Sequence, residues 1–235
     1  MSNKLNNGAE ISRSTNILNS IIMNKIIILA VFLAALTAGN AQGQGQGTFG
    51  VRAGLNSTNM ILRGNGVSVK ANKETGFQIG VVTENEPPEN KRIFTQGGFL
   101  FVSQKCSFDE SFLGSTNGTI SLSYLRMPFN SIFKVDLSSL KLLGYGGGIL
   151  GLALAGKTTS EERGGEKIEQ KIKFGGPIGR LEIGFNLGAG LQFGNFQATV
   201  EYNINLNYGV LFNDTNGVSM FNNGFLFNLT YFFGK

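Results

Sequence analysis

The sequence predicts an all-β fold: an eight-stranded antiparallel up-and-down transmembrane β-barrel, preceded by a helical signal peptide. Apolar and polar residues alternate along segments such as 196–210, which exceed the roughly 5–6 residues usual for a strand. Glycine is abundant, at 34 residues, and charged residues make up only 15% of the chain, a mixture that disfavours intrinsic disorder. The mean hydropathy is close to zero, as expected where apolar residues alternate with polar ones instead of clustering.

The N-terminal segment has the pattern of a secretory signal peptide. A basic residue precedes the apolar run Ile26–Leu36, and small residues follow it up to Ala41. The run is shorter than the roughly 20 residues of a transmembrane helix, although a retained helical anchor is an alternative. We expect cleavage after Ala41, so that residues 1–41 are an N-terminal extension and signal peptide and residues 42–235 are the barrel domain. The start codon is either Met1 or Met23.

The first four strands are expected at 49–56, 77–81, 93–105 and 119–135. In the first two, apolar residues alternate strictly with polar residues or glycine, which is the period of a strand with two different faces. The third continues this alternation with phenylalanine and serine on one face. The fourth contains Pro128, which suggests a bulge or kink because proline cannot donate a hydrogen bond to a neighbouring strand.

The last four strands are expected at 140–155, 182–193, 196–210 and 225–233. The first of these is rich in glycine and leucine. Its glycines do not form a phosphate-binding loop, because no helical pattern follows them. Small residues instead relieve crowding inside a narrow barrel and permit curvature. The other three alternate almost without interruption.

The connections between these strands alternate between long and short. The long ones are expected at 57–74, 107–118, 156–173 and 213–223, and the short ones at 85–91, 136–139 and 194–195. Long loops on one side and short turns on the other are typical of outer-membrane barrels, in which the long loops face outward. The segment 157–173 carries many charges of both signs, which predicts a solvated, mobile loop. This loop is either a contact surface for a protein or lipopolysaccharide, or simply a soluble connection.

The polar faces of the strands are expected to line the inside of the barrel. Eight strands enclose a space that their own side chains about fill, so we expect a polar plug without free diffusion of solutes. The residues predicted to form it are Arg52, Gln78, Gln96, Arg126, Glu182, Gln192, Glu201 and Asn203.

The composition argues against most enzyme classes. The chain has no histidine, which excludes Ser-His-Asp and Cys-His catalysis as well as metal sites that depend on histidine. No catalytic residue, metal or cofactor is predicted. Two alternatives to a non-enzymatic barrel remain open. Glu182 and Glu201 on neighbouring strands allow an outer-membrane enzyme that uses carboxylates, and alternation alone also allows a soluble lipocalin-like barrel that binds a small apolar ligand.

Nucleic acid is not an expected partner, and no disulfide is expected. The formal net charge is +5, but lysine and arginine are dispersed along the chain instead of forming a basic block. Cys106 is the single cysteine, so an internal disulfide is impossible. We interpret it as a small residue near a strand end.

Several short motifs resemble those of the PorT-type outer-membrane β-barrel family. Gly50–Asn56 resembles its opening strand, and Tyr124–Pro128 resembles its Tyr-Leu-Glu-Ile-Pro strand. Leu187–Leu191 and Leu229–Phe233 resemble its later strands. The resemblance implies an outer-membrane protein of a Gram-negative cell with an envelope, adhesion or secretion-accessory role. The partners it implies are outer-membrane lipid and lipopolysaccharide, the outer-membrane assembly machinery, and other envelope or secretion proteins.

The motifs depart from that family in two charges. Arg126 stands where the family carries glutamate, and Glu201 stands where it often carries arginine. Because a buried lone charge costs several kcal/mol, our hypothesis is that Arg126 and Glu201 attract each other inside the barrel. The alternative is that water solvates each of them there.

The end of the chain is aromatic. Tyr231, Phe232 and Phe233 resemble the C-terminal signal that the outer-membrane assembly machinery reads, although two further residues follow them here.

Overall fold

The computed structural model describes residues 47–64, 67–87, 92–109, 117–161, 167–172, 180–207 and 219–234. All of them belong to one compact unit that spans residues 44–235. The predicted signal peptide lies outside the described residues, as does part of each predicted long connection. The described residues include no helix long and apolar enough to cross a membrane.

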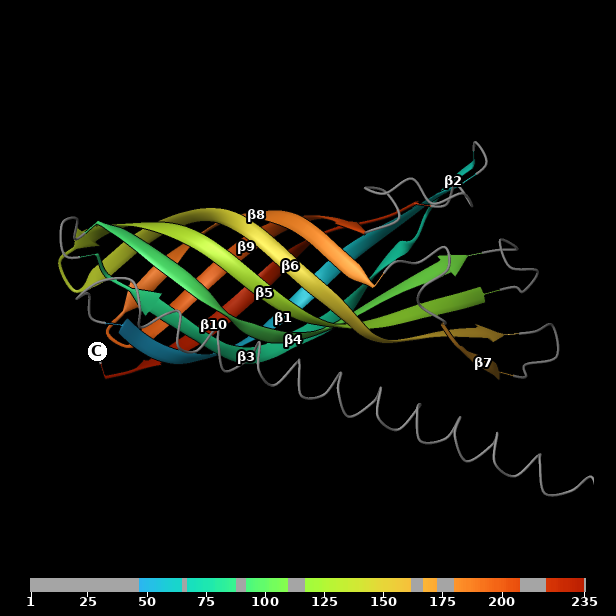
Figure 1. Ribbon diagram of the computed structural model, residues 1–235, viewed down its shortest axis with the longest axis horizontal. Coiled ribbons are helices and arrows are strands. Elements are labelled where there is room, and N and C mark those ends of the chain that lie inside the picture. The colour runs from blue at the N-terminus through green and yellow to red at the C-terminus, as the bar shows by residue number, and fades with distance from the viewer. Residues whose placement is uncertain are drawn as a thin grey trace, which may run out of the picture. The chain divides into compact units, whose positions relative to one another are not determined.

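Eight long antiparallel strands close into a ring (Figure 1). Each ring strand pairs with the next one along the chain, and the last strand returns to pair with the first from Phe49↔Phe233 to Arg63↔Ser219. This closure confirms the predicted eight-stranded, up-and-down antiparallel barrel. The ring strands are β1 (Gly47–Gly64), β3 (Asn72–Asn85), β4 (Ile93–Asp109), β5 (Asn117–Leu137), β6 (Leu140–Glu161), β8 (Leu181–Phe193), β9 (Phe196–Asn207) and β10 (Ser219–Phe233).

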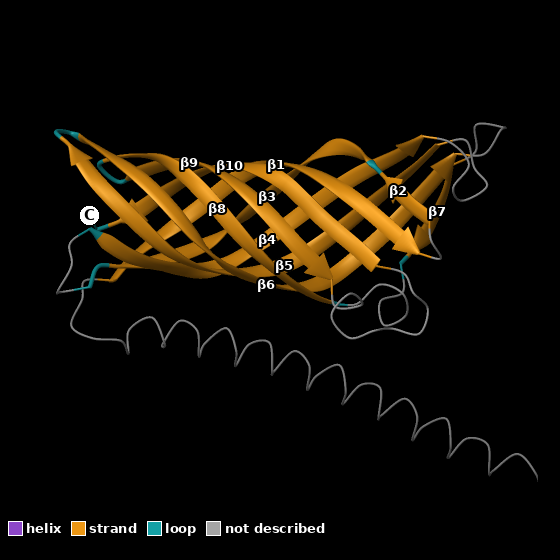
Figure 2. Cartoon of the chain, turned by 90° about the horizontal axis from the view of Figure 1, so that it is seen from above, coloured by secondary structure: helices purple, strands orange, loops and turns teal. Residues whose placement is uncertain are grey.

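Two short strands lie outside the ring and lengthen two of its hairpins. β2 (Val67–Lys70) pairs with the end of β1, and β7 (Lys167–Lys171) pairs with the end of β6. Figure 2 shows both at the end of the barrel opposite the C-terminus. The four predicted long connections, 57–74, 107–118, 156–173 and 213–223, were therefore all too long, because strand residues occupy part of each. β2 has only four residues, and β7 is almost entirely polar in sequence, so neither carries an alternation long enough to reveal a strand.

Side chains alternate between the inside and the outside of the ring. In β1, Arg52 and Asn56 are buried, whereas Phe49, Val51 and Leu55 are 42–58% exposed on the outer surface. The same order holds in β9 and at most positions of β10, whose inward face also carries the apolar Leu226 and Phe232. The lipocalin-like alternative requires the reverse orientation, with the apolar face turned toward an internal ligand.

The strand that contains proline keeps its register there. β5 and β6 pair regularly through Pro128↔Ile149, and the shift in register falls between Ser123 and Tyr124. On the β4 side the ladder is interrupted at Met127 and Pro128, between Gly97↔Phe129 and Leu100↔Arg126, and resumes in the same register. The proline thus breaks the pairing on one side, and the bulge itself lies further along the strand. Proline removes one backbone hydrogen-bond donor from the strand. The strand tolerates this loss toward one neighbour because its pairing with the other neighbour holds the register.

Candidate functional site

All eight residues predicted to line the inside are buried in the structure, from 0% exposure for Glu182 to 5% for Glu201. They do not form one continuous plug. Arg52, Gln96 and Gln192 join a network near the short-turn end of the barrel, whereas Arg126 and Glu182 form a separate ion pair. Gln78 donates to Asn228, and Glu201 accepts from a tyrosine. Buried Asn203 has a carbonyl oxygen with no partner in the described structure.

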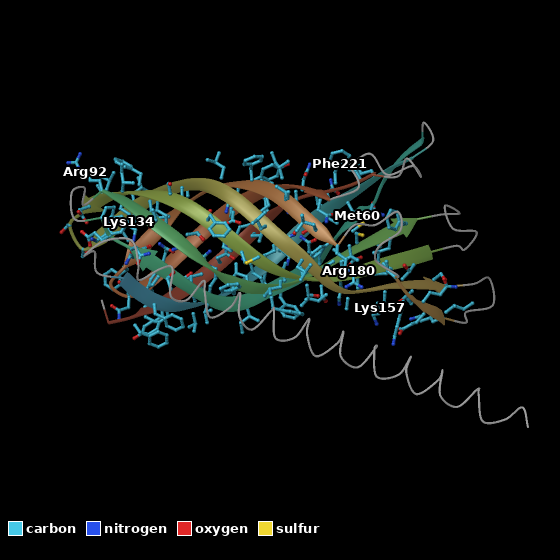
Figure 3. All side chains as sticks on the ribbon, in the orientation of Figure 1. Met60, Arg92, Lys134, Lys157, Arg180 and Phe221 are labelled. Carbon is cyan, nitrogen blue, oxygen red and sulfur yellow. The ribbon has the colours of Figure 1, made fainter. Side chains whose placement is uncertain are left out.

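The network near the short turns is held by Lys134. Its Nζ donates to Glu84 Oε1 at 2.5 Å and to Gln192 Oε1 at 2.7 Å. Gln96 accepts from Arg52 at 2.5 Å and donates to Glu84 Oε2 at 3.4 Å. These five side chains come from β1, β3, β4, β5 and β8, so the network crosses the interior and ties together strands distant in sequence. Figure 3 shows Lys134 at the same end as Arg92.

Sequence reasoning missed Thr230 and Gln197, which accept from Arg52 and Gln96 in this network, and also two charged members, Glu84 and Lys134. Both lie on the inward side, in step with the predicted residues Gln78 and Arg126 of their own strands. Glu84 was missed because the predicted strand ended at residue 81. Lys134 lay inside the predicted strand 119–135, and its position in the alternation with Arg126 would have identified it.

Arg126 forms a two-pronged ion pair with Glu182. Its Nε and one terminal nitrogen donate to the two carboxylate oxygens at 2.7 and 2.8 Å, with the two side chains 2% and 0% exposed. The ring of Tyr124 lies 5.4 Å from the guanidinium carbon. The hypothesis that Arg126 and Glu201 attract each other is therefore wrong about the direct partner of Arg126, which is Glu182. Glu201 also faces the interior and contributes a weaker favourable charge interaction with Arg126. Arg126 is in register with Gly151, and Gly151 with Glu182, which places Glu182 and not Glu201 opposite the arginine.

Glu201 has a different partner and stands apart from Glu182. Its carboxylate accepts from the Tyr145 hydroxyl at 2.8 Å. Glu201 pairs with Gly188 across β8, six positions along that strand from Glu182, which corresponds to about 20 Å. The two carboxylates thus do not form the acid pair that an enzyme would require. No group of three or more His, Cys, Asp or Glu side chains in the described ranges could hold a metal ion.

Inward glycines make room for these contacts. Arg126 reaches Glu182 over Gly151, where an added Cβ would lie 2.6 Å from a carboxylate oxygen of Glu182. Tyr145 reaches Glu201 over Gly188, where an added Cβ would lie 2.6 Å from the tyrosine hydroxyl. In both cases a glycine on the intervening position lets two long polar side chains meet across it. The abundant glycine therefore serves the packing of the interior.

The interior also holds an apolar cluster that sequence reasoning missed. The inward positions of β4 and β5 near the long connections are largely apolar, and Cys106 is one of them at 1% exposure. The expectation of a purely polar plug is therefore incomplete. The main members of the cluster are Met60, Val82, Leu100, Val102, Cys106, Phe108, Ile120, Leu122, Tyr124 and Phe232.

The three terminal aromatics split between the two faces of β10. Phe232 points inward and is fully buried, whereas Phe233 is 50% exposed on the outside. Phe233 stacks on Phe49 across the seam at 6.0 Å and meets the edge of Tyr231 at 5.2 Å between ring centroids. Of these three aromatic residues, Tyr231 and Phe233 therefore lie on the outer face of the closing strand.

Large apolar residues form a belt around the outside of the ring. Aromatic residues mark its short-turn side, where Phe196 and Tyr231 approach to 4.9 Å between centroids, and its other side, where Tyr202 and Phe225 do the same. Val200 and Leu229, between these levels, are 44% and 54% exposed. An apolar band between two aromatic girdles is the exterior of a membrane barrel.

No protein-family model and no curated protein matches the chain, so the resemblance to the PorT-type family rests on its short motifs alone. Among solved structures, the chain is similar to Ail, the attachment invasion locus protein of Yersinia pestis. That similarity has 16% identity and a TM-score of 0.38, and it covers 79% of this chain and 99% of that one. Neisserial surface protein A is 13% identical with a TM-score of 0.39, over 79% of this chain and 98% of that one. The N-terminal β-barrel domain of Pseudomonas aeruginosa OprF is 14% identical with a TM-score of 0.24, over 78% and 99%.

Proposed function

We propose that this protein is a non-enzymatic outer-membrane β-barrel of a Gram-negative cell. The observation that carries the proposal is the outward belt, in which Phe185, Leu187 and Phe193 are 66%, 72% and 63% exposed on a single strand. Soluble monomers rarely expose contiguous apolar patches larger than a few hundred Å². The belt residues of β10 extend from Phe225 to Phe233, about 26 Å along the strand. At the strand tilt of about 40° that is usual in membrane barrels this is a height of about 20 Å, comparable with their apolar band of about 25 Å.

The role that fits this architecture is display of the outer connections on a rigid cylinder. The polar networks and the apolar cluster fill the interior, which supports a plugged barrel without free passage of solutes. The β1–β2 and β6–β7 hairpins extend the sheet past the belt. Surface loops of a rigid scaffold commonly carry binding functions. We therefore assign an envelope, adhesion or secretion-accessory role, with lipopolysaccharide and other envelope or secretion proteins as partners.

The same proposal includes the route to the membrane. A signal peptide cleaved after Ala41 would deliver residues 42–235 to the periplasm. The assembly machinery would then read the closing strand, and the outward positions of Tyr231 and Phe233 support this part of the proposal.

Membrane fractionation combined with gel migration tests the function. We expect the full chain to sediment with outer membranes and to migrate differently before and after boiling, because a closed barrel resists unfolding by detergent until it is heated. Recovery of the folded protein in the soluble periplasmic fraction would contradict the proposal and restore a soluble barrel.

A further inference from the structure

Three lysines and a serine form one row on the outer face of the barrel near the long connections. Lys105 of β4 pairs with Ser121 of β5, Ser121 with Lys157 of β6, and Lys157 with Lys171 of β7. Directly paired residues of antiparallel strands lie on the same face, and neighbouring strands are about 4.8 Å apart, so the row is about 14 Å long. All three lysines are exposed, and Ser121 is half-buried between them.

The positive charge of this row is only partly balanced. Lys157 Nζ lies 3.0 Å from Glu169 Oε1. Lys105 and Lys171 make no ion pair within the described part of the chain. Like charges that directly face each other across strands, as Lys157 and Lys171 do, are destabilising. An anion placed on the row would relieve this repulsion.

The depth of the row relative to the belt indicates which anion it meets. Two positions closer to the belt than the row, the outer face carries Ser103 and Ser123. Two positions closer still, it carries Phe101 and Leu125. The outer face thus passes from apolar to small hydroxyl to lysine side chains within about 13 Å along the strand. A lipid leaflet has the same order, from hydrocarbon through its polar linkages to its phosphates.

The row also occupies one side of the ring. At the same end of the barrel, three of the described outward side chains of β1 and β10, those of Ser57, Asn59 and Asn223, are uncharged. At the opposite end, Lys141 is paired with Asp136 at 3.2 Å. Figure 3 shows Lys157 and Arg180 at the end away from Arg92. The basic side of the ring therefore includes the row on β4–β7 and also the exposed Lys73 of the neighbouring β3.

We propose that the row Lys105–Ser121–Lys157–Lys171 binds the phosphate groups of anionic lipid in the outer leaflet, those of the lipid A part of lipopolysaccharide. The lysines supply the charge, and the Ser121 hydroxyl donates a hydrogen bond to a phosphate oxygen between them. This inference rests on the proposed function, because it needs the belt to lie in a membrane.

Refolded full-length protein in phosphatidylcholine vesicles tests the inference, with bisphosphorylated lipid A as the probe. The variant Lys105→Gln/Lys171→Gln removes two positive charges from the row, and the control Arg92→Gln/Lys141→Gln removes two at the opposite end. Because a basic residue near an anionic surface strengthens binding about five-fold, we expect the row variant to bind lipid A about 25-fold more weakly. The control should stay within about two-fold of wild type. With dephosphorylated lipid A, the difference between wild type and the row variant should disappear.

Equal lipid A binding by the row variant and the control would overturn the inference. Full displacement of lipid A from wild type by soluble inositol hexakisphosphate at physiological salt would also overturn it, because the row would then be a general polyanion surface. Insertion is monitored separately by heat-dependent gel migration. If none of the three proteins inserts into vesicles, the proposed function itself fails and this inference falls with it.

Discussion

The buried ion pair of Arg126 and Glu182 is the residue-scale feature with the largest expected effect. Both side chains are almost completely buried, so neither charge is solvated when the other is removed. We expect Arg126→Met to destabilise the barrel by about 3–5 kcal/mol, because Glu182 would be left as an uncompensated buried charge. Urea unfolding followed by far-ultraviolet circular dichroism measures this. The companion variant Arg126→Met/Glu182→Met should recover most of the loss, and failure to recover it would contradict the pairing.

The packing of Tyr145 against Gly188 predicts a second residue-scale effect. A Cβ on Gly188 would lie 2.6 Å from the tyrosine hydroxyl, whereas a Cβ on Gly144 would meet nothing within 4 Å. We therefore expect Gly188→Ala to cost about 1–3 kcal/mol by overpacking, and Gly144→Ala to be nearly neutral. Urea midpoints of the two variants, measured side by side, provide the comparison. Equal midpoints would show that the tyrosine ring moves freely out of this contact.

At the scale of elements, ring strands and hairpin extensions should respond differently to proline. Val200 of β9 pairs with β8 on one side and β10 on the other, whereas Glu169 of β7 pairs only with β6 among the described strands. Val200→Pro should abolish folding, because it removes a hydrogen bond within the closed ring. Glu169→Pro should leave the barrel closed. The fraction of protein that migrates as the folded form on an unheated gel checks both, and loss of that form in Glu169→Pro would mean that β7 is needed for closure.

The same distinction explains how much of the elements was predictable. All eight ring strands could be placed because the segments inside the belt alternate between an apolar outside and a polar inside. β2 and β7 could not be placed, because the alternation of β2 lasts for only four residues and the sequence of β7 is almost entirely polar. The inward residues followed from the same alternation. Their partners did not, because the contact of Arg126 with Glu182 depends on the registers of β5, β6 and β8, which no single segment encodes.

At the scale of the whole molecule, the interior and exterior have exchanged the roles they have in a soluble protein. Charged networks such as that of Lys134 hold the strands together from within, while the outer surface is apolar. Inside the ring these charges keep hydrogen-bond partners, which limits the cost of burying them. The exposed apolar belt is favourable only where lipid replaces water around it. The fold is therefore matched to a membrane as its solvent.

This match predicts that a charge on the belt should cost free energy according to its depth. Leu187 lies midway along β8 and is 72% exposed, whereas Leu137 lies beside a short turn and is 53% exposed. In vesicles, Leu187→Arg should destabilise the barrel by about 2–4 kcal/mol and Leu137→Arg by about 0–1 kcal/mol. Urea or guanidinium titrations of vesicle-inserted protein measure both values. A soluble barrel would give the opposite result for Leu187→Arg, because replacing an exposed leucine with arginine in water removes an unfavourable apolar surface. An unchanged or higher free energy of unfolding would therefore show that this belt does not face lipid.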